Sequence, residues 1–185
     1  MRFYLLCSIL FFLAACSSED SLDGKVPFQD SIEGVKSEAF GVEYFFSDSA
    51  RVTARLSAGH MIEKEEGEDP KKYVIQYLSD GVEINFLNSD GRTTSKINSK
   101  SGIYNKEKGL AELTGSVVLL NGKGEKLETE QLFWKEMQDS IYTPKFVRIE
   151  TPERIIIGEH GMRANSEFTA WTILESRGEL TIDDE

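Results

Sequence analysis

The stretch that decides the fold is ELTGSVVLLNGKGEKLETEQLFWKEMQDSIYTPKFVRIE, residues 112–150. Apolar and polar residues alternate in it over several short runs, which is typical of strands that bury one face. In one run, Leu127 and Thr129 project to the side opposite Glu128 and Glu130. The run therefore predicts a strand with its two acidic side chains in water.

The same alternation recurs upstream in VEINF, residues 82–86. Turn signals separate the runs: Ser-Asp-Gly at 79–81 and at 89–91, and Asn-Gly at 121–122. Long helical patterns are missing, and only residues 35–40 and 133–138 fit short helical turns. We therefore predict an all-β domain built of repeated antiparallel strands.

An approximate internal repeat underlies these strands. When the chain is shifted by 30 residues, apolar positions overlay as follows: Val117 on Val147, Leu119 on Ile149, Tyr104 on Trp134, Ile141 on Trp171, and Leu127 on both Ile97 and Ile157. Stacked hairpins of this kind place their apolar rows on one concave or enclosed face. The rows form either an ordinary hydrophobic core or, if the interior is partly unfilled, a groove for an acyl chain.

The N-terminus predicts export and lipid attachment. Residues 3–16 are apolar except for Ser8, too few for the roughly 20 residues that a membrane-spanning helix needs. Arg2, the apolar run and the Leu-Ala-Ala-Cys ending have the layout of a secretory signal and resemble the lipobox of bacterial lipoproteins. We predict a signal peptide at 1–15, a lipidated Cys16 with a polar tether at 16–36, and the β domain at 37–182.

Composition limits the function further. The formal net charge is -11, which argues against a nucleic-acid partner and against docking on an anionic membrane by charge alone. Both cysteines lie in the leader, so the mature domain has no free thiol. The insert EKEEGEDPKK, residues 63–72, fits a solvated hairpin loop.

Catalytic and metal-binding patterns are missing from the sequence. His60 and His160 each stand without a second His or Cys at ligand spacing. No nucleophile elbow, phosphate loop or dinucleotide fingerprint occurs. We expect neither catalysis nor a metal or cofactor.

Residues 112–164 closely resemble the LptC family of lipopolysaccharide export proteins. The matching motifs are Gly115-x-Val117, Gly124 followed by Leu127-Glu128-Thr129-Glu130-x-Leu132-x-Trp134, Ile141-Tyr142-Thr143, Val147-x-Ile149 and Gly158-x-x-Gly161-Met162. The likeness covers most of residues 45–175, and the wider OstA-like group shares the repeat.

The resemblance implies a twisted β-jellyroll that carries lipopolysaccharide acyl chains. It also implies a periplasm-facing protein, held at the inner membrane of a Gram-negative-type bacterium, that catalyses nothing. Such a protein receives glycolipid from a transporter of LptB, LptF and LptG and passes it to an LptA-like jellyroll through paired sheet edges. Carried onto this chain, the groove candidates are Val82, Ile84, Val117, Leu119, Leu127, Val147, Ile149 and Ile157, with Met162 and Trp171 closing the groove toward the C-terminal edge.

Two features depart from the family pattern. Many members are anchored by a transmembrane helix, whereas this leader predicts a lipoprotein anchor at Cys16. The domain is acidic although the cargo is anionic, which suits binding through the apolar tails.

Residues after about 168 are expected to include the strand that pairs with the next jellyroll. The alternative is a structural or adaptor lipoprotein that binds only proteins through open sheet edges.

Overall fold

The computed structural model describes residues 34–174 and 176–177. The predicted signal peptide, Cys16 and nearly all of the predicted tether lie outside the described residues, so those predictions stay untested. The described strands are β1 (Val35–Asp48), β2 (Arg51–Glu66), β3 (Tyr73–Leu87), β4 (Thr93–Ser99), β5 (Ser101–Asn105), β6 (Leu110–Asn121), β7 (Lys126–Lys135), β8 (Ser140–Thr143), β9 (Val147–Glu150), β10 (Ile155–Gly158), β11 (Met162–Asn165), β12 (Trp171–Ile173) and β13 (Ser176–Arg177). A single 3₁₀ turn in this part of the chain, η1 (Glu136–Gln138), follows β7.

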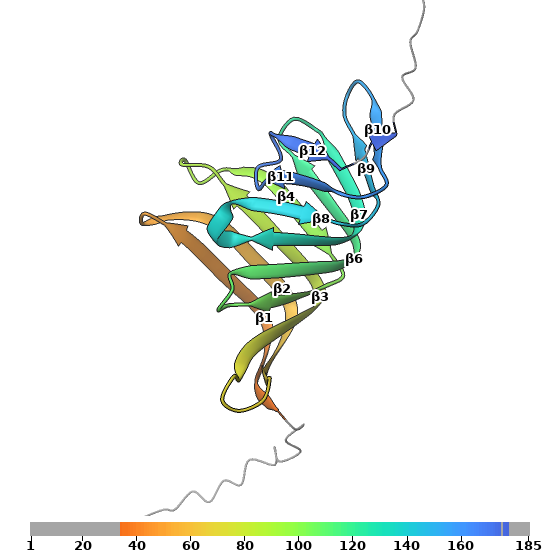
Figure 1. Ribbon diagram of the computed structural model, residues 1–185. Coiled ribbons are helices and arrows are strands. Elements are labelled where there is room, and N and C mark those ends of the chain that lie inside the picture. Colours follow the sequence, from red (N-terminus) through yellow and green to blue (C-terminus); the bar gives the residue numbers. More distant parts are fainter. Residues whose placement is uncertain (1–33, 175, 178–185) are drawn as a thin grey trace, which may run out of the picture. The chain divides into compact units, whose positions relative to one another are not determined.

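All the described strands belong to one antiparallel sheet that divides in two (Figure 1). The first half of β3 pairs with β5, and its second half pairs with β4. Strand β7 likewise pairs with β9 through its first half and with β8 through its second half. Each long strand therefore takes part in two layers, which confirms the predicted all-β jellyroll.

A line of strand bends and breaks, here called the crease, separates the two layers. It runs through Asp80–Gly81 in β3, Lys100 between β4 and β5, and Gly115–Ser116 in β6. Hydrogen bonds cross it: the Gly81 N–H donates to the Lys100 carbonyl at 3.3 Å, and the Lys100 N–H donates to the Gly115 carbonyl at 3.1 Å. The bends have positive φ at four positions, 60° at Asp80, 86° at Gly81, 81° at Gly115 and 52° at Ser116, where the strands turn from one layer into the other.

The apolar rows predicted by the repeat are rows of paired residues across one layer. The longest row is Leu56, Ile84, Ile97, Leu119, Leu127, Ile149 and Ile156, each paired with the next. Leu119 and Ile149, which overlaid in the 30-residue shift, lie two strands apart in this row, with Leu127 between them. The repeat of about 30 residues therefore separates two positions, such as Leu119 and Ile149, that lie in the same row of the sheet.

The two layers face each other across a core of buried side chains. Phe46 of β1 packs edge-on against Trp134 of β7 at 4.8 Å between ring centroids, and Phe86 of β3 lies 5.3 Å from the same ring. The aliphatic core residues Leu113, Leu132 and Ile141 are 0–1% exposed. Burial of this extent supplies the main driving force for folding.

Two local predictions had different outcomes. The helical turn predicted at 35–40 is wrong, because this segment lies in β1 and pairs with β2 from Lys64 to His60. The turn predicted at 133–138 is confirmed only at its end, where η1 follows the last residues of β7. In residues 35–40, the backbone hydrogen bonds to β2 outweigh the local preference for a helical turn.

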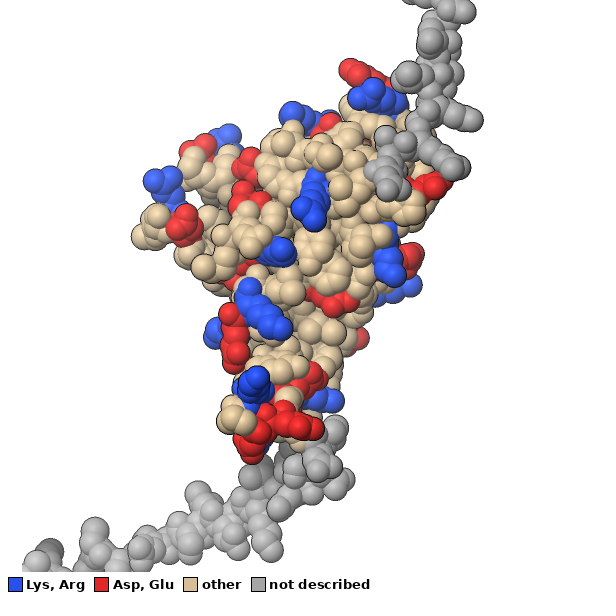
Figure 2. Space-filling view, viewed as in Figure 1, with Lys and Arg blue, Asp and Glu red and all other residues tan. Residues whose placement is uncertain are grey.

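The acidic insert at 63–72 ends β2 and forms the turn to β3. Figure 2 shows acidic groups gathered at the lower end of the view, over this turn. Lys36 and Lys72 form ion pairs with Glu65 at 2.9 and 3.9 Å. The insert is therefore a solvated turn, but its first four residues belong to the strand.

Candidate functional site

The predicted groove residues lie mostly inside the packed core. Eight of them are 0–2% exposed: Val82, Ile84, Val117, Leu119, Leu127, Val147, Ile149 and Met162. All eight belong to one cluster of contacting side chains. The centre of the interior is therefore filled by the protein's own side chains, and a lipid chain has no free path along these residues without displacing them.

Ile157 and Trp171 lie elsewhere. Ile157 is half-buried and pairs with Arg148, while its neighbour Ile156 pairs with Ile149 and packs against the core. Because successive strand residues point to opposite faces, the inward position belongs to Ile156. Trp171 is half-buried on β12 and stacks on Phe168 with 6.3 Å between ring centroids.

The interior opens at one side, where the last residues of β1 and the first residues of β2 approach η1. A hollow of about 710 Å³ lies there, lined by Ser47, Asp48, Thr53, Ala54, Phe86, Leu87, Trp134, Glu136, Met137, Gln138, Asp139, Ser166 and Glu167. A second hollow of about 480 Å³ lies between β1 and the β5–β6 turn. Three residues line both hollows: Ser47, Glu136 and Met137. These two hollows together are called the mouth below.

Aromatic rings form the inner wall of the mouth. Phe46 contacts Tyr104 at 5.5 Å and Trp134 at 4.8 Å between ring centroids, in edge-to-face geometry. Tyr44 lies 6.2 Å from Tyr104. Such rings present large apolar area with few rotatable bonds, which suits a surface that accepts a flexible apolar chain.

A hydrogen bond fixes one side of the mouth. The Tyr104 hydroxyl donates to Glu136 Oε2 at 2.9 Å and so ties β5 to η1. Burial, and then the hydrogen bond to the Glu136 carboxylate, raises the pKa of the Tyr104 hydroxyl well above its ordinary value. The hydroxyl therefore stays a donor throughout the physiological range.

Sequence reasoning missed the inward face of β1. Val42 and Tyr44 pack against the core while half-buried, and Phe46 is 8% exposed. These three residues alternate with outward-facing ones, so a period-2 signal is present at 42–46, inside the predicted β domain but in a segment that we did not assign to a strand. The strand order ends at β1 on one side and at β12 on the other, with β13 ending a side branch.

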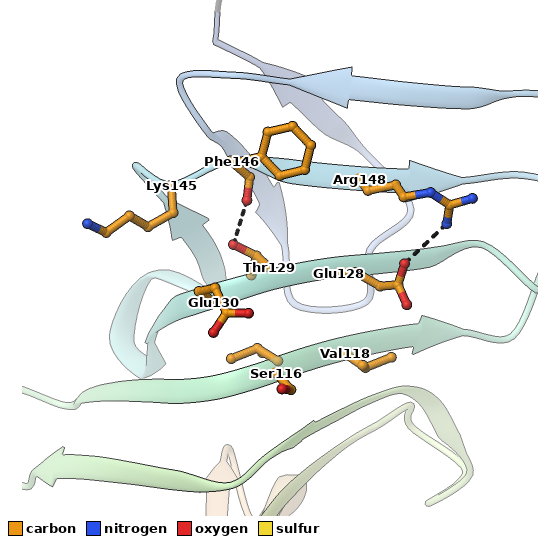
Figure 3. Close-up of a pocket in the computed structure, with 9 residues that line it drawn as sticks. Ser116, Val118, Glu128, Thr129, Glu130, Lys145, Phe146 and Arg148 are labelled. Atoms are coloured by element: carbon orange, nitrogen blue, oxygen red, sulfur yellow. Dashed lines mark hydrogen bonds and ion pairs between the residues drawn. The ribbon is translucent and has the colours of Figure 1, made fainter.

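A further hollow of about 470 Å³ lies on the outer face of β6, β7 and β9 (Figure 3). There the Thr129 hydroxyl donates to the Phe146 carbonyl at 2.8 Å, and Arg148 donates to Glu128 at 3.1 Å. Phe146 is 53% exposed at its rim. Of the predicted groove residues only Val117 lines it, so it is separate from the mouth.

Other candidate chemistry is sparse within the described residues. His60 Nε2 lies 2.7 Å from Glu38, and its ring stacks on Phe40 at 4.7 Å between centroids, which is a structural arrangement on the outer face. The described part of the chain contains no group of three His, Cys, Asp or Glu residues that could hold a metal ion. Helices long and apolar enough to cross a bilayer are likewise absent from residues 34–174 and 176–177.

Comparison with known proteins assigns the family. The family model described as lipopolysaccharide-assembly, LptC-related, matches residues 73–179, from the start of β3 past β13. A search among curated proteins gave no match. The match covers more than half of the chain and includes the crease, both layers and most of the mouth. This chain therefore belongs to the LptC-related family of lipopolysaccharide-assembly proteins.

Proposed function

We propose that this protein is a non-catalytic bridge in lipopolysaccharide export, which holds glycolipid acyl chains at its mouth and hands them to an adjoining jellyroll. The observation that carries the proposal is the aromatic-walled opening between β1 and η1. An acyl chain gains about 0.8 kcal/mol for each CH₂ group that leaves water. Membership of the LptC-related family supplies the transport pathway.

The mouth, rather than the central rows, is the proposed contact surface for the chains. Met137 is 86% exposed and lines both hollows, so a chain can reach it without any rearrangement of the core. Leu119 and Ile149 are fully buried, so they serve the core first. Cargo that reaches them must first separate the two layers.

Site-specific photo-crosslinking tests this assignment. A photoreactive amino acid in place of Met137 or Tyr44 should crosslink to lipopolysaccharide during active export. Leu120 and Ile103, which are 47% and 36% exposed, provide matched controls at apolar positions that do not line the mouth. Equal labelling at the control positions and at the mouth would refute the proposal.

The expected partners are a transporter of LptB, LptF and LptG type and an LptA-like jellyroll. The ends of the sheet at β1 and β12 support partnering, because an edge strand offers unpaired backbone groups to another strand. The same edges support the second candidate, an adaptor that binds only proteins. Retained binding of a jellyroll partner without any crosslink to lipid at the mouth would favour that adaptor.

Anchoring through a lipid on Cys16 is part of the proposal. It would hold the domain in the cell envelope, facing the periplasm at the inner membrane, with residues up to about 36 as the tether. The basis is the sequence of the leader, which ends in Leu-Ala-Ala-Cys.

A further inference from the structure

The larger hollow of the mouth has a one-sided charge. Among the residues that the structure describes, four carboxylates line it, Asp48, Glu136, Asp139 and Glu167, and neither Lys nor Arg does. They come from the end of β1, from η1 and the residue after it, and from the turn after β11. Segments far apart in the sequence thus bring acidic groups to one rim.

These carboxylates are not neutralised within the described part of the chain, where none of the four forms an ion pair. On the outer face, by contrast, Arg148 pairs with acidic neighbours at 2.8 and 3.1 Å. Arg51 stands opposite Asp48 in the strand register, and both line an adjoining hollow, but they form no ion pair. The rim therefore keeps a net negative charge over an apolar wall.

A buried polar group lies beside the same hollow. Ser166 lines it and is 2% exposed, and its hydroxyl oxygen, which has almost no accessible surface, has no hydrogen-bond partner among the described residues. Its carbonyl is already occupied, because the Ser95 hydroxyl donates to it at 2.6 Å. Buried hydroxyls normally find partners, so this one marks a position where the polar part of a ligand can be received.

We infer that the larger hollow of the mouth selects a glycolipid whose headgroup carries amines close to its acyl chains, and disfavours one that presents only bare phosphates. This inference rests on the proposed function and adds that the transported glycolipid carries positively charged amines in its headgroup. The apolar chain lies against Phe86 and Trp134, and the ammonium group meets the acidic rim. The aromatic faces also attract cations, whereas a phosphate in this hollow meets four carboxylates of like charge.

The acidic side chains of the rim act here through their charge. Within the described residues, no group of three His, Cys, Asp or Glu residues could hold a metal ion by itself. Direct pairing with amines needs no such convergence, because each ammonium can meet a single carboxylate.

Binding of three amphiphiles with the same dodecyl chain tests the inference. In a Trp171→Phe background, Trp134 is the only tryptophan of the chain, and its fluorescence reports occupation of the hollow. Dodecylammonium, dodecyl maltoside and dodecyl sulfate are titrated below their micelle concentrations. At low salt we expect dodecylammonium to bind about tenfold more tightly than dodecyl sulfate, with the ratio shrinking as salt is added.

Two variants that remove carboxylates distinguish the effect of the rim on binding from the effect of the protein's overall negative charge. The rim variant combines Asp48→Asn, Asp139→Asn and Glu167→Gln; the control variant combines Asp90→Asn, Glu130→Gln and Glu153→Gln, none of which lines the hollow. Both remove the same formal charge. The rim variant should lower the preference to about twofold, and the control should retain it.

The outcomes distinguish this inference from the proposed function. If the amphiphiles bind equally, or dodecyl sulfate binds best, the charge preference is wrong while the lipid-binding mouth stands. If no dodecyl chain perturbs Trp134, the proposed mouth itself fails. As a final arm, diphosphoryl lipid A with ethanolamine on its phosphates should displace dodecylammonium better than unmodified lipid A, and the reverse order would overturn the inference.

Discussion

Gly161 should be one of the least replaceable residues of the fold. It lies between β10 and β11, beside the break between β8 and β9, and has a φ of +93°. A Cβ added there would lie 1.9 Å from the Thr143 carbonyl oxygen and 2.9 Å from the Pro144 Cα. Both obstacles are backbone atoms, so a side-chain rotation cannot remove the clash.

The expected cost follows from two separate terms. An alanine held in left-handed conformation costs about 1–2 kcal/mol, and the more restricted unfolded chain returns about 0.4–1 kcal/mol of this. The clash adds the cost of moving the 143–144 backbone away from the turn. We expect Gly161→Ala to lower the free energy of unfolding by more than about 3 kcal/mol, which places it among the severe substitutions.

Gly124→Ala is the matched control, because Gly124 has a φ of +80° and an added Cβ there would have no atom of the described residues within 4 Å. It should cost about 1 kcal/mol, from conformation alone. In urea denaturation, with a slope of about 2 kcal/mol/M, the midpoint should fall by more than about 1.5 M for Gly161→Ala and by about 0.5 M for Gly124→Ala. Equal midpoints for the two variants would refute the argument from close backbone approach.

Three more perturbations test the core, the mouth and the anchor. Leu119→Ala should cost about 2–5 kcal/mol in urea denaturation, whereas Leu120→Ala, at a neighbouring position that is 47% exposed, should cost under about 0.5 kcal/mol; similar losses would contradict the assignment of faces. The pKa of the Tyr104 hydroxyl is raised in the folded state, so the protonated hydroxyl stabilises the fold below the unfolded-state pKa of about 10, and this stabilisation is lost as the pH rises above that value. Tyr104→Phe should therefore flatten the fall of the free energy of unfolding at alkaline pH. An unchanged pH profile would count against the hydrogen bond to Glu136. Cys16→Ala should move the protein from the membrane to the soluble fraction, and membrane retention in cells that lack the transporter would contradict lipid anchoring.

The sequence predicted the inward faces well because alternation is a local signal. Leu127 and Thr129 are buried as predicted, and Glu128 and Glu130 are the more exposed pair. Between Thr129 and Leu132, however, the buried positions are three residues apart. That change of phase marks the crease, and a pattern read within one strand cannot show that two halves of the strand belong to different layers.

The error at Ile157 has the same kind of cause. The 30-residue overlay assumed a constant repeat, but the ladder from β9 to β10 pairs Ile149 with Ile156. A shift of one residue exchanges the two faces of a strand. The charged rim was also beyond prediction, because Asp48 and Glu167 meet only through the packing of the two layers.

A packed centre and a hollow edge are both consequences of how this domain must be stabilised. Its two cysteines lie at positions 7 and 16, so no disulfide can join the layers, and apolar contact between their facing side chains supplies most of the attraction between them. The central rows therefore cannot remain empty, because each cavity there would weaken the fold in proportion to its volume. At the mouth the strands end in turns and η1, and there a hollow of about 710 Å³ coexists with a closed core. The stability of the sheet thus places this opening into the interior at the side bounded by β1, which is also one end of the strand order.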